Sequence, residues 1–181
     1  MRPLSYVRVD RLDCHVKRPV LIVGPLSDCV ADKLVHEFPR KYLHVLPEVM
    51  RFPQPIMEKN LEENVFVEYR RKGAHFECLT VAAVQSVGEK NLHGILDISL
   101  AALEHLHQQH IFPVVLLLKF KSVKHVREVK DTRLPSDKMA AKAAKEMYEH
   151  VLKVEAEHRH LISGQFSFHS LFHFLSSGKL V

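Results

Sequence analysis

The residues most suggestive of chemistry form a glycine-containing turn, Gly24-Pro25-Leu26-Ser27. An apolar run over residues 20–23 precedes the turn, and apolar residues at helical spacing follow it. The pattern therefore predicts a strand, a turn and a helix. This is the scaffold of a phosphate-binding loop, in which backbone N–H groups surround the phosphates. In such a loop a lysine neutralises their charge and a hydroxyl group holds Mg²⁺.

The chemical groups of a working loop are missing. Counted from Gly24, Cys29 stands where the second glycine is needed, Val30 replaces the lysine, and Ala31 replaces the serine or threonine. Cys29 and Val30 also carry Cβ atoms, which resist positive φ angles. The sequence predicts a degenerate loop with no catalytic residue and no bound cofactor. A strand, turn and helix that never held phosphate explains the pattern equally simply.

Asp97 is a second candidate site residue, because it lies near the end of an apolar strand predicted over residues 93–98. In open α/β sheets ligands gather at the carboxyl ends of strands. The alternative is that Asp97, together with Ser99, caps a helix predicted over residues 100–109.

Basic residues are unevenly distributed. Residues 119–145 hold nine Lys and Arg against three acidic residues, a net charge of +6, while the whole chain carries +5. Such a segment can contact anionic lipid or an acidic partner, or it can be a solvated helix face. Aromatic residues do not alternate with these charges, which argues against nucleic acid. A smaller basic group occupies a predicted turn over residues 70–73. The candidate anion or partner contacts are Arg51, Arg70, Arg71, Lys72, Lys119, Lys121, Lys124 and Arg127.

Cysteine and histidine patterns favour neither a disulfide framework nor a metal centre. The three cysteines are far apart and form no C-x-x-C pair, which predicts a reducing, intracellular compartment. Cys78 lies inside a predicted strand, and we predict that it is a small buried apolar residue. Among fourteen histidines, His169 and His173 share a helix face, but no glutamate lies between them as a zinc-protease motif requires. We therefore predict no metal site.

Length and hydropathy fit one domain with a parallel sheet and helices on both faces. The longest apolar run, residues 111–118, is far shorter than the roughly 20 residues that span a bilayer. Residues 47–56 contain three prolines and are predicted to be a loop. Strands are predicted over residues 4–10, 20–23, 42–46, 65–69, 74–79, 93–98, 113–119 and 160–163. Helices are predicted from about Ser27 to before Pro39, over 57–63, 80–90, 100–109, 122–131, 135–158 and 166–175.

Several segments taken in order resemble the guanylate kinase-like domain of a membrane-associated guanylate kinase scaffold. They are residues 18–25, 32–34, 37–39, 66–68, 94–98 and 113–118, and the resemblance extends over residues 18–175. The strand at residues 5–10 resembles the chain that leaves the SH3 domain of these scaffolds. Within the family, the discs large group is the closest match. The reduced kinase-like domains of zonula occludens and caspase-recruitment scaffolds are the alternatives.

The resemblance implies an adenylate-kinase-like P-loop fold with a truncated GMP-binding lobe. Glu68 and Asp97 occupy positions that match the GMP site, but as two carboxylates without basic partners. Apart from Arg40, which directly follows Pro39, Arg51 is the only arginine before Phe66, where a true enzyme carries several. The Y-G-T-S motif near the guanine is replaced by residues 77–80, Glu-Cys-Leu-Thr. These losses imply no phosphoryl transfer, and phosphopeptide binding that is weak or displaced.

The sequence thus predicts a non-catalytic interaction module over residues 18–176. Residues 1–17 would be a linker and strand left from a preceding SH3 domain, and residues 177–181 a tail. As implied by the family, the partners would be junction, polarity or cytoskeletal proteins and the SH3 domain of its own chain. The location would be cytoplasmic, at the plasma membrane and cell junctions. The alternative function is peripheral binding to an anionic membrane or acidic partner through residues 119–145, and a nucleoside-monophosphate kinase is much less favoured.

Overall fold

The structure is a computed structural model that describes residues 15–128 and 141–167. Several sequence predictions fall partly or wholly outside these ranges. They are the strand over residues 4–10, the middle of the basic segment including Lys130, Arg133 and Lys138, the adjoining ends of the helices predicted over 122–131 and 135–158, the pair His169 and His173, the part of the last helix beyond Ser167, and the tail over residues 177–181.

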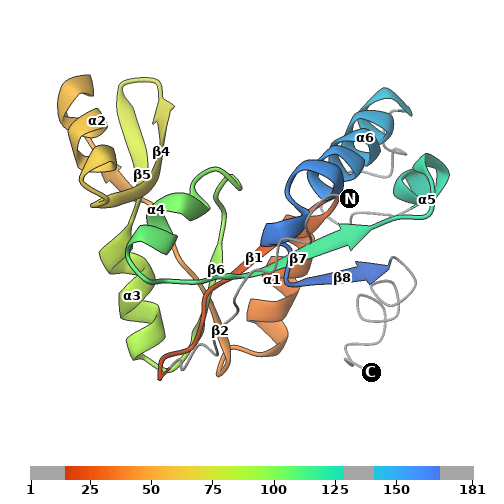
Figure 1. Ribbon diagram of the computed structural model, residues 1–181, viewed down its shortest axis with the longest axis horizontal. Coiled ribbons are helices and arrows are strands. Elements are labelled where there is room, and N and C mark those ends of the chain that lie inside the picture. The colour runs from red at the N-terminus through yellow and green to blue at the C-terminus, as the bar shows by residue number, and fades with distance from the viewer. Residues whose placement is uncertain (1–14, 129–140, 168–181) are drawn as a thin grey trace, which may run out of the picture.

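A parallel five-stranded sheet forms the main body, as predicted (Figure 1). Its order is β2-β6-β1-β7-β8, and β1 lies at the centre, where Leu21 pairs with Leu96 on one side and Val115 on the other. Strands covered on both faces read as continuous apolar runs, which is the pattern of β1 and β7. The strands are β1 (Val20–Val23), β2 (Tyr42–His44), β6 (His93–Leu96), β7 (Val114–Lys119) and β8 (Gly164–Ser167).

Helices cover both faces because successive strand residues point in opposite directions. Ile22 packs with Val30 and Val126 on one face, whereas Leu21 packs with Val84 and other residues on the opposite face. The first face is covered by α1 (Ser27–Glu37), α5 (Val123–Glu128) and the first half of α6 (Ala141–Glu157). The second is covered by α3 (Val81–Glu89) and α4 (Leu103–Gln108).

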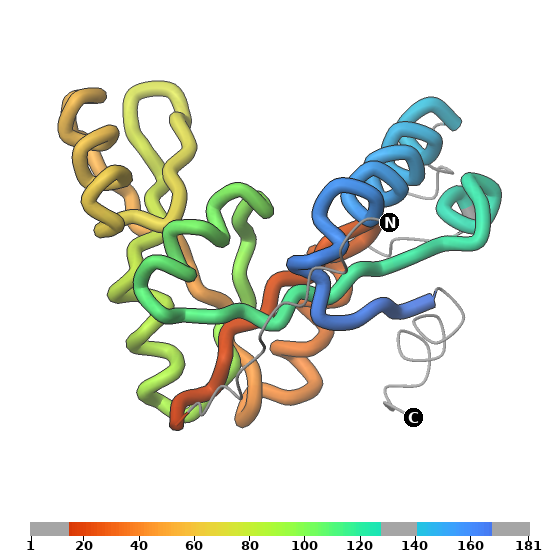
Figure 2. The backbone as a smooth tube through the Cα atoms, in the orientation of Figure 1, coloured from red at the N-terminus to blue at the C-terminus, as the bar shows by residue number. Residues whose placement is uncertain are grey.

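A small lobe is inserted between β2 and α3 (Figure 2). It is an antiparallel sheet of order β3-β5-β4 with one helix against it, and its core contains Met57, Phe66, Phe76 and Cys78. Cys78 is fully buried, as predicted, and burial raises the pKa of its thiol. The elements are β3 (Glu48–Met50), α2 (Gln54–Glu62), β4 (Phe66–Lys72) and β5 (His75–Thr80).

The prediction of a loop over residues 47–56 was wrong. Residues 48–50 form β3 because they pair with β5, a tertiary contact that the proline count does not reveal. Helix α2 begins at Gln54, after Pro53 and with Pro55 in its first turn. Prolines are tolerated there because the first N–H groups of a helix have no partner within the helix.

Two further boundaries differ from prediction. Residues 159–161 form a 3₁₀ turn, η1 (Arg159–Leu161), instead of a strand, and the edge strand β8 begins only at Gly164. Phe166 therefore starts no helix. Helix α4 begins at Leu103 and not at residue 100. The Thr80 cap was predicted correctly, since its hydroxyl accepts a hydrogen bond from the Ala83 N–H at 3.1 Å.

Within the two described ranges, no helix combines the length and the apolar character needed to cross a bilayer.

Gly24 is predicted to be indispensable for the turn after β1. Its φ is 124°, and a Cβ atom there would lie 2.6 Å from the Leu118 carbonyl oxygen. We expect Gly24→Ala to lower the free energy of unfolding by about 3 kcal/mol or more, through backbone strain and the clash. Gly73→Ala is the control, because Gly73 also has a positive φ, 61°, but nothing lies near its Cβ position. It should cost only about 1 kcal/mol. Equal losses in urea denaturation would contradict the packing argument.

Candidate functional site

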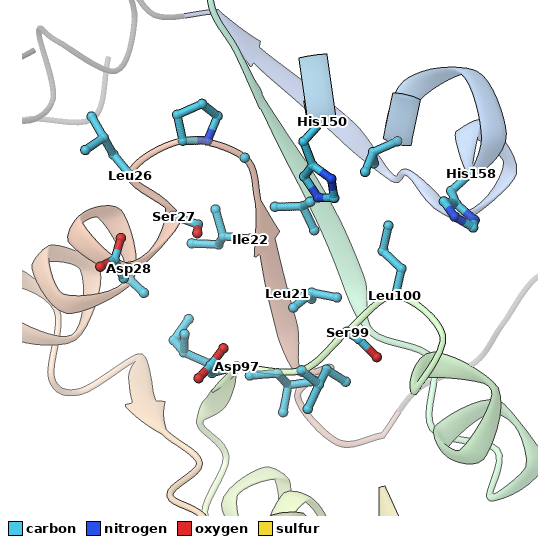
Figure 3. A pocket seen from close by; sticks show the side chains of 18 of the residues that line it. Leu21, Ile22, Leu26, Ser27, Asp28, Asp97, Ser99, Leu100, His150 and His158 are labelled. Carbon is cyan, nitrogen blue, oxygen red and sulfur yellow. The ribbon is translucent and has the colours of Figure 1, made fainter. Parts of the chain in front are cut away.

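A cleft of about 910 Å³ lies at the carboxyl ends of β1, β2 and β6 and is bounded on one side by α6 (Figure 3). Leu21 and Ile22 of β1 lie between Asp97, which follows β6, and His150 of α6. Much of the remaining lining is apolar and includes Leu46, Pro47, Ile98, Leu100 and Met147. This is the edge where an open α/β sheet binds its ligand.

The turn after β1 does not form a phosphate nest. Only Gly24, Pro25 and Leu26 separate β1 from α1, and Leu26 takes a left-handed conformation with φ 62°. The N–H of Ser27 is already bonded to the Gly24 carbonyl, at 3.2 Å. Helix α1 thus begins before the positions at which a phosphate loop needs its glycine and lysine. The prediction of a strand, a turn and a helix is confirmed.

Val30 and Ala31 point into the core packed beneath the turn. Val30 is 6% exposed and packs beside Ile22 and Leu34. A lysine at position 30 would have to bury its ammonium group or leave the core, and both are costly. The loop thus lacks the lysine. A lysine placed at position 30 would also point into the core and could not reach a ligand.

The charge of the cleft is unfavourable for a nucleotide. Among the described residues that line it there is no arginine, and the one lysine, Lys153, pairs with Glu157 at 4.0 Å. His44 Nε2 lies 3.1 Å from Asp32. The acidic lining residues are Asp28, Asp32, Asp97 and Glu157, and the histidines are His44, His150 and His158. With neutral histidines this lining is net negative, so it repels phosphates instead of neutralising them.

Arg70 bridges the two carboxylates of the matched GMP site. Its Nη2 donates to Glu68 Oε2 at 2.9 Å, and its Nη1 donates to Asp97 Oδ2 at 3.1 Å. A further bond joins Nη2 to the Asp97 carbonyl at 3.1 Å, and Glu68 Oε1 accepts from the Ser99 N–H at 3.1 Å. We call this set of residues, Glu68, Arg70, Asp97 and Ser99, the arginine bridge.

The arginine bridge corrects two sequence predictions. Glu68 and Asp97 do have a basic partner, and Arg70 lies within β4 and not in the hairpin turn, which is Gly73-Ala74. Asp97 does not share the helix cap with Ser99, because its carboxylate bonds to Arg70. The Ser99 hydroxyl accepts a hydrogen bond from the Ala102 N–H at 3.3 Å, in the turn before α4. The i, i+2 spacing of Glu68 and Arg70 on one strand face was the available signal.

Electrostatics favour this bridge. Partial burial would by itself lower the pKa of the Arg70 guanidinium, but the hydrogen bonds and charges of Asp97 and Glu68 outweigh that effect and raise it. The two carboxylates at the matched GMP-site positions are thus occupied by a cation of the same chain.

The remaining predicted contacts of the small lobe lie outside the cleft. Arg51 is exposed between β3 and α2. Arg71 is exposed and reaches only the Gly73 carbonyl, at 3.4 Å, and Lys72 lies 3.7 Å from Glu77. None of these three residues lines the cleft. Arg70 does not line it either, but it bonds to Asp97, which does.

Several lysines of the basic segment are structural. Lys119 donates to both carboxylate oxygens of Glu155 at 2.6 Å, and this hydrogen bond is the main reason that the pKa of Glu155 is lowered. The bond ties β7 to α6. Lys142 and Lys145 pair with Glu146 and Glu149 one helical turn away. Lys121, Lys124 and Arg127 are exposed at α5.

Within the described ranges, no group of three or more His, Cys, Asp and Glu side chains is arranged to hold a metal ion.

Comparison with known proteins identifies the family of this fold and cleft. The family model described as guanylate kinase matches residues 16–168. The chain belongs to the guanylate kinase family. Its resemblance to the membrane-associated guanylate kinase scaffolds is also confirmed by the curated relatives. It is 40% identical to human Disks large homolog 5 and 31% identical to the Drosophila melanogaster Disks large 1 tumor suppressor protein, with 89% of this chain aligned in each.

The chain spans only a small part of those relatives, 8% of the first and 18% of the second. Two solved structures share its fold. The SH3-kinase fragment of tight junction protein 3 aligns with a TM-score of 0.59 and 19% identity, covering 86% of this chain and 51% of that one. Guanylate kinase from Anaplasma phagocytophilum aligns with a TM-score of 0.52 and 10% identity, covering 88% and 81% respectively.

We predict that Arg70 holds the small lobe against the loop after β6. Arg70→Gln should leave Glu68 and Asp97 without their cation. Amide hydrogen exchange should then become faster in β4 and in residues 97–100. Because the groups are partly exposed, the loss of stability should be only about 1 kcal/mol. Arg71→Gln is the matched control on the next residue of the strand, and it should change neither quantity. Unchanged exchange in Arg70→Gln would show that the bridge does not restrain the lobe.

Proposed function

We propose that this chain is a non-catalytic protein-interaction module of a membrane-associated guanylate kinase scaffold, and that its cleft binds a protein partner instead of a nucleotide. The observation that carries the proposal is the arginine bridge, which occupies the carboxylates of the matched GMP site. Phosphoryl transfer depends almost wholly on positioning and charge neutralisation. The described lining of this cleft supplies neither a free lysine nor an arginine for that purpose.

Exposed apolar residues support a protein partner. Ten large apolar residues are exposed in the described chain, and four of them fall within residues 46–56, which run from the end of β2 through β3 into α2. Leu46 both lines the cleft and is 72% exposed. We call these four residues the apolar rim: Leu46, Val49, Phe52 and Ile56, which are 72%, 64%, 48% and 44% exposed. Of the four, Leu46 lines the cleft, and exposed apolar residues at a cleft are typical of a protein-binding site.

The wider setting is proposed from the relatives. A scaffold role at cell junctions and in cell polarity, a cytoplasmic location beneath the plasma membrane, and contact with an SH3 domain of the same protein all fit the Disks large relatives and the tight junction fragment. The solved fragment contains an SH3 domain together with the kinase domain. Disks large homolog 5 is far longer than this chain and leaves ample room for such a domain.

The alternative of a membrane or acidic-partner binder at residues 119–145 receives less support. Lys119, Lys142 and Lys145 are each paired with a glutamate, so their charges are already balanced. Lys121, Lys124 and Arg127 are exposed and form a smaller basic surface at α5. If that surface dominated, binding would weaken steeply with added salt, whereas binding through the apolar rim would depend little on salt.

We predict that the chain binds neither GMP nor Mg-ATP and forms no ADP from the two together. Calorimetric titration should give no heat of binding at millimolar ligand, because the cleft is net negative and its turn offers no nest. A coupled ADP assay measures turnover in the same sample. Micromolar binding or measurable turnover would overturn the non-catalytic assignment.

We predict that the apolar rim and cleft carry the protein partner. The double variant Leu46→Ser and Val49→Ser should abolish crosslinks between the rim and partner proteins when the chain is expressed in epithelial cells. Crosslinked peptides identified by mass spectrometry give both the partner and the surface that it contacts.

The matched control removes two other exposed apolar residues, Val65→Ser and Leu152→Ser, each 46% exposed. Neither residue lines the cleft. The control should retain the crosslinks, and equal loss in both variants would show that exposed apolar area in general, and not the rim, captures partners.

A further inference from the structure

A second recess lies at the opposite edge of the main sheet from the cleft. It has a volume of about 450 Å³ and is lined by Lys17, Arg40, Lys41, Tyr42, Asn91 and His93. These residues come from three separate stretches of sequence. They meet because β2, β6 and β1 are neighbours and parallel, so the residues at their amino ends converge. The chain before β1 also packs beside the end of α3, where the Lys17 carbonyl lies close to Gly88.

The recess concentrates positive charge. Three of its lining residues are permanently cationic, and no aspartate or glutamate lines it. Among the described residues, Lys17, Arg40 and Lys41 form no ion pair. Glu37 and Glu89 end the adjacent helices but neither lines the recess. Lys41 instead lies over the Phe38 ring, with its Nζ 5.9 Å from the ring centroid. This contrasts with the basic segment, where Lys119, Lys142 and Lys145 are each paired with a glutamate.

The polar wall of the recess is held in place by the sheet. His93 Nδ1 lies 2.8 Å from the Arg18 carbonyl oxygen, which can only accept, so Nδ1 carries the hydrogen. The His93 N–H donates to the Lys41 carbonyl at 2.8 Å, and the imidazole stacks against Tyr42 with ring centroids 5.5 Å apart. Arg18 is itself fixed by hydrogen bonds to the carbonyls of Phe112 and Pro113, at 2.6 and 3.0 Å. The backbone that carries the three cationic residues is therefore held in place by hydrogen bonds.

We propose that this recess binds a phosphate monoester, at a site separate from the cleft. The three lining cations are sufficient to neutralise the two negative charges of a phosphate dianion. The Arg40 guanidinium and the two ammonium groups are the donors that phosphate oxygens prefer, and the Tyr42 hydroxyl and the Asn91 amide are neutral donors in the same wall. The recess is large enough for one phosphate group and the atoms that carry it.

The C-termini of two helices at this edge carry partial negative charges, which oppose the positive charge of the recess but are smaller. Helices α1 and α3 end at Glu37 and Glu89, and each C-terminus carries a partial charge of about −0.5. Neutralising these ends explains part of the basic character. The lining of the recess itself still holds three cations and no carboxylate.

The test uses the whole 181-residue chain, with inorganic phosphate and O-phosphoserine as soluble probes. In NMR titrations, the largest shifts should fall at residues 17, 40–42 and 91–93. The double variant Arg40→Gln and Lys41→Gln should bind O-phosphoserine about tenfold or more weakly, since it loses two charge-assisted donors. Both side chains are exposed, so the urea unfolding curve should not change.

A matched variant, Lys121→Gln and Arg127→Gln, removes the same charges from an exposed surface at α5. It should bind both probes like the parent chain. Equal weakening in both variants, or shifts spread over the whole basic surface, would overturn the proposal in favour of general charge attraction.

A second arm separates the two sources of a phosphate monoester. Vesicles of phosphatidylcholine containing phosphatidylinositol 4-phosphate present it on a lipid headgroup. If the parent chain and the Lys121 and Arg127 variant bind these vesicles but the Arg40 and Lys41 variant does not, the result would support the site and assign it to a lipid. Binding of soluble O-phosphoserine without vesicle binding would support the site and assign it to a soluble ligand. Binding of neither probe would refute the site.

Discussion

The carboxyl edge of the sheet depends on the close packing of the turn after β1 against β7. Gly24 approaches the Leu118 carbonyl so closely that no side chain fits between them, and α1 starts three residues later with Val30 in the core. That packing leaves no space for a loop that curves around phosphates. The loss of nucleotide chemistry that we propose would therefore rest on the backbone and the core as well as on three replaced side chains. Restoring the lysine alone would introduce a buried charge without creating a site.

Charge is separated between the two ends of the parallel sheet. At the carboxyl edge the acidic lining of the cleft is offset by Arg70, which reaches across from the small lobe. At the amino edge three cations surround a recess without a carboxylate. A nucleotide kinase needs its positive charge at the carboxyl edge, where the phosphates react. Here the unpaired positive charge of the two described pockets lies at the other end, which is consistent with a cleft used for apolar contact.

The sequence predicted those parts of the structure that depend on local pattern. Continuous apolar runs and helical spacing placed β1, β7 and α1, and the Thr80 cap followed from a residue preference. The errors arose where long-range contacts decide. Residues 48–50 form a strand only because β5 lies beside them, and Arg70 becomes a site residue only because Asp97, 27 positions later, lies beside it. The basic recess was missed for the same reason, since its residues are dispersed while the conspicuous charge run at residues 119–145 is partly neutralised.

The small lobe contacts the main sheet in two places, through a shared buried cluster and through the arginine bridge. These contacts affect what the cleft can bind. At its base, Val67 and Leu79 belong to the same buried cluster as Leu96 of the main sheet, so the lobe does not have a wholly separate core. Farther along β4, the arginine bridge joins this strand to the loop after β6 without any ligand. In a nucleotide enzyme such a lobe gains by moving, because closure over the substrate excludes water and completes the site. Here intramolecular bonds join the lobe to the main sheet without a ligand, and if they restrain it as we predict, the apolar rim and the cleft wall are preorganised. A partner that binds them would lose less free energy to ordering the surface, which suits a binding module better than a catalyst.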